Sequence, residues 1–229
     1  MFNIDEFETK RIIEIIESVD DTLQYSSIDL FKRAMTSVGF VVRKLKTYPN
    51  FSSYSCQGKI GEHYVYLDIY QRNHNNVVYI YRKSYYIEKL MGKNVKKLSH
   101  RDNDLPALVY YDEHHGKVSE LRYFTNNTQC REFGKPLNIT YEYDKLQKIA
   151  STECRFITSY DDINFSVYSV TYVDNLIVDG AVCYNNELLS VRTLSSIIPD
   201  IQMVDLNDLF NLKNVITEEH LKLIEMFTI

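Results

Sequence analysis

The segment Arg101-Asp102-Asn103-Asp104-Leu105-Pro106-Ala107-Leu108-Val109-Tyr110-Tyr111 is the most informative part of the sequence. The chain repeats its pattern as Arg131-Glu132-Phe133-Gly134-Lys135-Pro136-Leu137-Asn138-Ile139-Thr140-Tyr141. The arginine, the proline and the final tyrosine recur at an offset of 30 residues. Repetition at this period is typical of stacked supersecondary units, each too small to bury its own apolar face. Because repeated scaffolds usually bind partners, the repeat favours a binding function over catalysis.

Each repeat predicts a β-hairpin. The proline cannot donate a ladder hydrogen bond, so it belongs at the start of a strand or on a sheet edge. In the first repeat, residues 101–124, two strands flank a turn at residues 112–116. In the second, residues 131–156, the turn falls at Asp144-Lys145.

Helices are expected before the repeats. Apolar residues at helical spacing predict one helix over residues 5–19. A second begins at Ser26, where Asp29 stands at the position of a capping box, and ends before Gly39, which fits a left-handed stop position.

Strands are expected around the repeats, where β-branched and aromatic residues dominate. Residues 63–70 and 77–81 predict one hairpin, residues 165–173 and 176–184 another, and Leu188 to Val191 a further strand. Residues 84–91 fit a short helix, although their tyrosines suit a strand equally well.

The expected fold is α+β and mainly antiparallel β, with a curled meander of β-hairpins. One compact domain is expected over residues 1–229. It comprises a helical part (1–39), the sheet with its repeats (40–192), and a pair of C-terminal helices (193–229).

The repeat resembles the MORN-like repeats of the YwqK antitoxin family, which also occur in proteins of giant DNA viruses and phages. The residues that carry the resemblance are Arg101 to Pro106, Tyr110, Tyr111, Gly116, Lys117 and Glu120. The second unit departs from the pattern, since Gly134-Lys135 replaces Asp104-Leu105. The resemblance implies a curled sheet that works by binding and carries no catalytic residues.

Composition narrows the other classes. The four cysteines form no CxxC pair, so neither a zinc site nor a redox motif is predicted, and no cofactor is expected. The acidic N-terminus lacks the features of a signal peptide. No apolar run approaches the ~20 residues of a membrane span. A reducing, cytoplasmic setting is therefore expected, that of the host cell if the protein is viral.

Charge is distributed unevenly along the chain. The net charge is +8 over residues 40–100, against −4 over residues 1–39 and −9 over residues 101–229. A basic, tyrosine-rich segment could bind nucleic acid, because Lys and Arg neutralise phosphates while tyrosines stack on bases. The alternative is that it packs against the acidic parts. The candidate nucleic-acid contacts are Arg43, Lys44, Lys46, Arg72, Arg82, Lys83, Lys93, Lys96 and Lys97.

Two small clusters could carry chemistry. Asp112-Glu113-His114-His115 has metal-ligand residue types, but it falls at a hairpin turn, where polar residues are expected anyway. His63 lies near Glu62 and Asp68, but strand alternation places His63 on the opposite side from both. Neither cluster is taken as a metal or catalytic site.

The leading hypothesis is a non-enzymatic protein, of viral or phage origin, that binds and blocks a host factor. Its candidate partner contacts are Tyr110, Tyr123, Tyr141 and Tyr143. The alternatives are a nucleic-acid-binding accessory protein that uses residues 40–100, and an unrecognised enzyme or nucleotide-binding protein. A viral protein could serve as the partner as well, and a homo-oligomer is possible because exposed sheet edges must be paired or covered.

Overall fold

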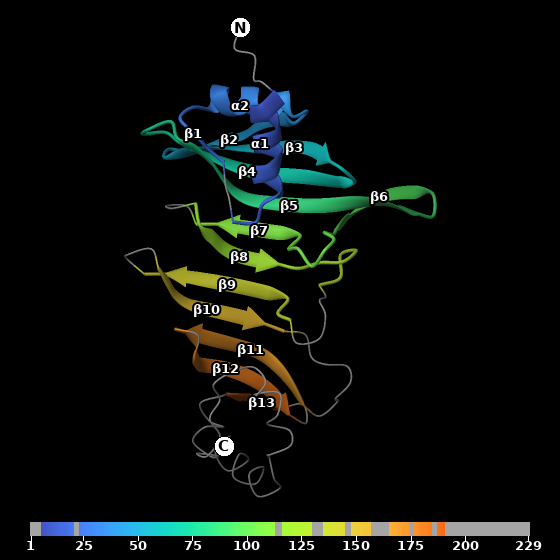
Figure 1. Ribbon diagram of the computed structural model, residues 1–229, viewed down its shortest axis with the longest axis vertical. Coiled ribbons are helices and arrows are strands. Elements are labelled where there is room, and N and C mark those ends of the chain that lie inside the picture. Colours follow the sequence, from blue (N-terminus) through green and yellow to red (C-terminus); the bar gives the residue numbers. More distant parts are fainter. Residues whose placement is uncertain are drawn as a thin grey trace, which may run out of the picture. The chain divides into compact units, whose positions relative to one another are not determined.

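The structure, a computed structural model, is mainly antiparallel β-sheet with two helices among the described residues, which are 6–20, 23–112, 116–129, 135–144, 148–156, 165–174, 176–184 and 187–190 (Figure 1). The chain divides into two compact units, Met1–Cys130 and Arg131–Ile229. The C-terminal helices expected over 193–229 lie outside the described residues. The expectation of a single domain stays a prediction.

Unit 1 begins with two helices, α1 (Glu6–Glu17) and α2 (Ile28–Ser37). The cap of α2 is Ser27 rather than Ser26, because the Ser27 side chain accepts a hydrogen bond from the Leu30 backbone N–H at 3.3 Å. Gly39 follows with φ +78°, a left-handed conformation that ends the helix as the sequence predicted.

The sheet of unit 1 is built from antiparallel neighbours. Its main path runs β8-β7-β5-β4-β3-β2, and β1 and β6 pair with parts of β5. The strands are β1 (Gln24–Tyr25), β2 (Val41–Thr47), β3 (Phe51–Ile60), β4 (His63–Arg72), β5 (Val78–Met91), β6 (Asn94–Ser99), β7 (Leu108–Tyr111) and β8 (Val118–Arg122).

The alternative of a helix over residues 84–91 was wrong. These residues belong to β5, which pairs with β4 through Tyr86, with β7 through Ser84, and with β6 up to Met91. Apolar spacing alone could not reveal that β5 is long enough to pair with both of its sequence neighbours, β4 and β6, and with β7 as well. Figure 1 shows β5 and β6 running together past the neighbouring strands.

Unit 2 contains an antiparallel meander of five described strands. They are β9 (Asn138–Tyr143), β10 (Ile149–Arg155), β11 (Phe165–Val173), β12 (Leu176–Tyr184) and β13 (Glu187–Ser190). The two sequence repeats correspond to the hairpins β7–β8 and β9–β10, one in each unit. The hairpins predicted from the repeats are therefore confirmed, whereas the MORN-like character of the sheet stays a prediction.

The core of unit 1 lies between the helices and one face of its sheet. Ile12 and Ile16 of α1 and Phe31 and Met35 of α2 are at most 1% exposed. Alternate sheet residues meet them, among them Cys56, Val65, Leu67, Ile69, Ile80 and Val109. Since burial of each large apolar side chain stabilises by roughly 1.5–3 kcal/mol, this face holds the unit together.

Candidate functional site

The face of the unit 1 sheet away from the helices is lined by tyrosines. Residues directly opposite one another on neighbouring strands share a face, and the register pairs Tyr64 with Tyr86, Tyr70 with Tyr79, and Asp68 with Arg82. We call this surface the tyrosine face and define it by Tyr64, Tyr66, Tyr70, Tyr79, Tyr81, Tyr86 and Tyr110. All but Tyr79 are only half-buried.

Two arginine–carboxylate pairs flank Tyr110 on the tyrosine face. Arg82 on β5 is hydrogen-bonded and ion-paired to Asp68 on β4. Arg122 on β8 binds Glu120 through two hydrogen bonds, of 2.8 and 3.1 Å. Both guanidinium groups lie over the Tyr110 ring, at 5.8 and 5.2 Å from its centroid. Tyr110 is therefore held between two arginines whose charges are neutralised by carboxylates.

Lysine and glutamate order one end of the tyrosine face. The Tyr64 hydroxyl donates to Glu88 Oε2 at 2.9 Å, and this bond raises the pKa of Tyr64. Lys97 lies 4.7 Å from the Tyr64 ring centroid and donates to the Tyr66 hydroxyl. Tyr66 meets Tyr86 edge to face, with the centroids 5.3 Å apart. Each of these polar groups thus has a partner.

Aromatic rings pack on one another at the opposite end. Tyr70 and Tyr81 are stacked, with centroids 4.1 Å apart, and Phe51 lies 4.8 Å from Tyr70. Tyr81 belongs to an irregularity at which β5 gains a residue over β4, which brings it beside Tyr70. Burial, and then the nearby Asp68, raise the pKa of Tyr81, so it stays a neutral phenol.

The helix-covered face uses its polar groups in a different way. Lys83, fully buried, donates from Nζ to the Ile15 and Ser18 carbonyl oxygens at 2.7 and 2.9 Å. The Tyr111 hydroxyl donates to Val19 O at 2.8 Å, and Tyr85 and Arg101 donate to Ile16 O and Glu17 O. These donors satisfy carbonyls at the end of α1, which lacks a basic residue in its last turn. The prediction that Lys83 contacts nucleic acid was wrong, because this residue has no exposed surface.

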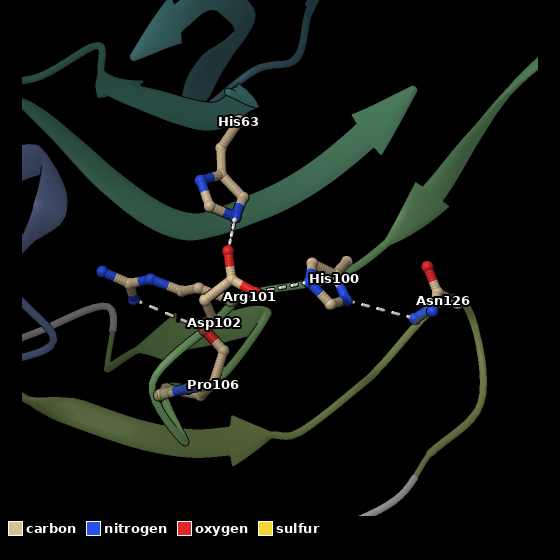
Figure 2. A network of polar contacts seen from close by, with 6 residues as sticks. All are labelled: His63, His100, Arg101, Asp102, Pro106 and Asn126. Carbon is tan, nitrogen blue, oxygen red and sulfur yellow. Dashed lines mark hydrogen bonds and ion pairs between the residues drawn. The ribbon is translucent and has the colours of Figure 1, made fainter. Parts of the chain in front are cut away.

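A histidine–aspartate cluster lies at the edge of the same unit (Figure 2). His63 begins β4, and His100 and Asp102 follow β6. Their possible ligand atoms lie within 4.8 Å of one another, as a metal site would require. His63 Nε2 is buried without a hydrogen bond, 3.5 Å from Asp102 Oδ2. Burial lowers the pKa of His63, although Asp102 acts in the opposite direction.

The tautomer of His100 argues against a metal centre. The Asn126 backbone N–H donates to His100 Nδ1 at 3.3 Å, so the neutral ring carries its proton on Nε2, which donates to Asp102 Oδ1 at 2.8 Å (Figure 2). A metal bound at Nε2 would need the opposite tautomer, with a protonated Nδ1 that donates. The cluster is therefore a set of polar contacts that hold the loop between β6 and β7 against the start of β4. His63 precedes His100 by 37 residues and Asp102 by 39, so no local sequence motif brings the three together.

The remaining candidate nucleic-acid contacts do not form one patch. Arg43, Lys44 and Lys46 lie exposed on the edge strand β2, with both faces of that strand represented. Arg72 and Arg82 lie half-buried on β4 and β5. Lys93, Lys96 and Lys97 belong to the end of the β5–β6 hairpin. Strand alternation has distributed the basic segment over several surfaces.

The candidate partner tyrosines are also separated. Tyr110 belongs to the tyrosine face, on β7. Tyr123 is only 7% exposed, so the prediction that it is an exposed partner contact was wrong. Tyr141 and Tyr143 lie half-buried on β9 of unit 2. Glu62 is exposed in the turn before His63, and Asp68 points to the tyrosine face. Glu113 to His115 and the side chain of Cys183 lie outside the described residues.

The described cysteines belong to the interior. Cys56 and Cys154 are free and buried. Burial raises the pKa of the Cys56 thiol to about 12, so it is a poor nucleophile at physiological pH.

Comparisons with family models, with characterised proteins and with solved structures found no match. The resemblance of residues 101–156 to MORN-like repeats therefore stays a prediction. Within the described part of the chain, no helix has the length and apolar character needed to cross a bilayer.

Proposed function

We propose that this is a non-catalytic protein-binding protein whose recognition surface is the tyrosine face of unit 1. The observation that carries the proposal is the concentration of seven tyrosines and two arginines on one sheet face, which neither of the described helices covers. Tyrosine and arginine are enriched among the residues that dominate protein–protein binding energy. Their rigid rings add contact area at a low cost in conformational entropy.

The charge balance of this face favours a protein over a nucleic acid. Asp68 and Glu120 neutralise Arg82 and Arg122, so these cations are not free to neutralise phosphates. Base stacking also needs exposed ring faces. The Tyr70 ring already stacks on Tyr81, and Tyr110 already carries two guanidinium groups. A protein partner could instead bury these pre-ordered groups without rearranging them.

Occlusion is the simplest mode of action for such a surface. A partner bound flat against the sheet loses access to its own covered surface, and no chemistry is required. The resemblance of the repeats to a family of binding proteins supports this role. A viral origin, with a host factor as the target, remains our proposal for its biological setting.

The test is affinity capture from lysate by the tagged full chain, with and without nuclease. We expect one protein, recovered in near-stoichiometric amount and unaffected by nuclease. The Tyr66→Ser/Tyr86→Ser variant should lose it, while Arg43→Ala/Lys44→Ala, on the edge strand, should keep it. Recovery of nucleic acid, with proteins lost on nuclease treatment, would overturn the proposal in favour of the nucleic-acid alternative.

A further inference from the structure

The β5–β6 hairpin ends in an arm, residues 88–97, that is separate from the rest of the sheet. Beyond Tyr86, β5 pairs only with β6 among the described strands, from Ile87–Leu98 to Met91–Asn94. Gly92, with φ +64°, lies in the turn between the two strands. Every residue from Glu88 to Lys97 is exposed. No residue of the arm is buried against the rest of the described chain.

Three lysines on the arm have no acidic partner among the described residues. Lys89 and Lys96 are directly opposite one another across the two strands, and Lys93 lies in the turn. Like charges at directly opposed positions destabilise a β-ladder, so this pair costs stability in the isolated protein. By contrast, Glu88 and Lys97 at the base of the arm are engaged by Tyr64 and Tyr66. The lysines are thus arranged to receive an anion.

Apolar side chains lie next to these lysines. Leu90 and Val95 face one another one position nearer the tip than the lysine pair, and they are 70% and 61% exposed. Met91 follows at 49%. One residue along a strand is about 3.4 Å. If the tip of the arm entered a surface first, Leu90 and Val95 would lie deeper in that surface than the ammonium groups of Lys89 and Lys96. The long Lys93 side chain could bend back, so that its ammonium group lies at the depth of the other two.

We infer that the arm docks on a lipid bilayer that contains anionic headgroups. The headgroups of such a bilayer offer phosphates and carboxylates to the lysines. The apolar layer beneath them can take up Leu90, Met91 and Val95. A nucleic acid would offer phosphates to the lysines but no apolar layer to Leu90 and Val95, which would stay in water. A protein on the tyrosine face could cover Leu90 and Val95 but would leave the opposed lysines unpaired on the other side.

The test is vesicle flotation of the full chain with phosphatidylcholine alone and with phosphatidylcholine mixed with phosphatidylserine. We expect binding only to the mixed vesicles, and weaker binding at high salt. The Lys89→Ala/Lys93→Ala/Lys96→Ala variant should reduce the bound-to-free ratio by at least about tenfold. The Leu90→Ser/Val95→Ser variant should also reduce it by about tenfold. The matched control, Arg43→Ala/Lys44→Ala/Lys46→Ala on β2, removes the same charge and should bind like the wild type.

Three outcomes would overturn the inference. One is no binding to the mixed vesicles at low salt, and another is an equal loss from the β2 variant, which would mean general charge attraction. The third is a pair of results: vesicle binding needs the three lysines but not Leu90 and Val95, and the same lysines are needed to bind an oligonucleotide. That pair of results would assign the arm to nucleic acid. None of these readouts depends on the partner of the tyrosine face, so the two proposals fail separately.

Discussion

The two faces of the unit 1 sheet use the same residue types for opposite purposes. Arg82 and Lys83 are adjacent in sequence, yet Arg82 lies on the tyrosine face and Lys83 is fully buried beneath α1. Tyr110 and Tyr111 repeat the arrangement on β7, since only Tyr111 reaches the end of α1. On one face, polar side chains hold α1 in place by hydrogen bonds to its backbone. On the other face, the same residue types remain partly exposed to solvent.

The largest difference between the two faces should come from replacing Lys83 and Arg82, which should affect the free energy of unfolding very differently. Lys83→Met keeps the length of the side chain but leaves the Ile15 and Ser18 carbonyls without their donor. We expect a loss of about 2–4 kcal/mol in the free energy of unfolding. Arg82→Met should cost about 1 kcal/mol or less, because its ion pair is partly exposed. Chemical denaturation measures both, and equal losses would contradict the division of roles.

A methyl group added on the helix side should have the next largest effect. Gly58 lies against the buried Phe40 ring, and a Cβ at this position would overlap that ring. We expect Gly58→Ala to reduce the free energy of unfolding by about 1–3 kcal/mol. Ser55→Ala, on the tyrosine face of the same strand, should change it by less than about 0.5 kcal/mol. Thermal unfolding of the pair would reveal whether the helix side is as closely packed as described.

Removal of single hydroxyl groups should give a smaller difference of the same sign. Tyr111→Phe loses the hydrogen bond to Val19 O, which should cost about 1 kcal/mol of unfolding free energy. Tyr110→Phe, on the half-buried face, should cost less than about 0.5 kcal/mol. If Tyr110→Phe proved the more costly of the two, the hydroxyl of Tyr111 would not hold α1.

The smallest effect concerns His63. Because burial lowers its pKa in the folded protein, the unfolded chain binds the proton more readily. The free energy of unfolding should therefore decrease as the pH falls through the ordinary range of histidine, near 6.5. His63→Asn should show a shallower decrease when denaturation is repeated between neutral and mildly acidic pH. An unchanged slope would mean that His63 does not contribute.

The hairpins were predictable because alternation and turn residues are local signals. The stop at Gly39 and the paired strands of both repeats follow from residues that are close in sequence. The full length of β5 was not predictable, since pairing with β4, β6 and β7 overrides the short-range pattern of Ser84 to Met91.

The candidate site was predictable only in its composition. A count of cations identifies the segment 40–100, but each step along a strand reverses the face, so Arg82 and Lys83 diverge. The end of α1 supplies the carbonyls that bury Lys83, and it lies 65 or more residues away in sequence. Likewise, the His63–Asp102 contact depends on where the loop after β6 returns to β4, which no local pattern specifies.

Site-specific photo-cross-linking would show whether a protein partner binds the tyrosine face. A photo-reactive residue at position 57, which lies opposite Tyr66 on the tyrosine face, would be compared with one at position 32, exposed on α2. Both proteins would be irradiated in nuclease-treated lysate, and the adducts identified by mass spectrometry. We expect position 57 to form an adduct with one protein, and position 32 to form no adduct with that protein. The same adduct from position 32 alone would contradict it, because the partner would then contact the helix side.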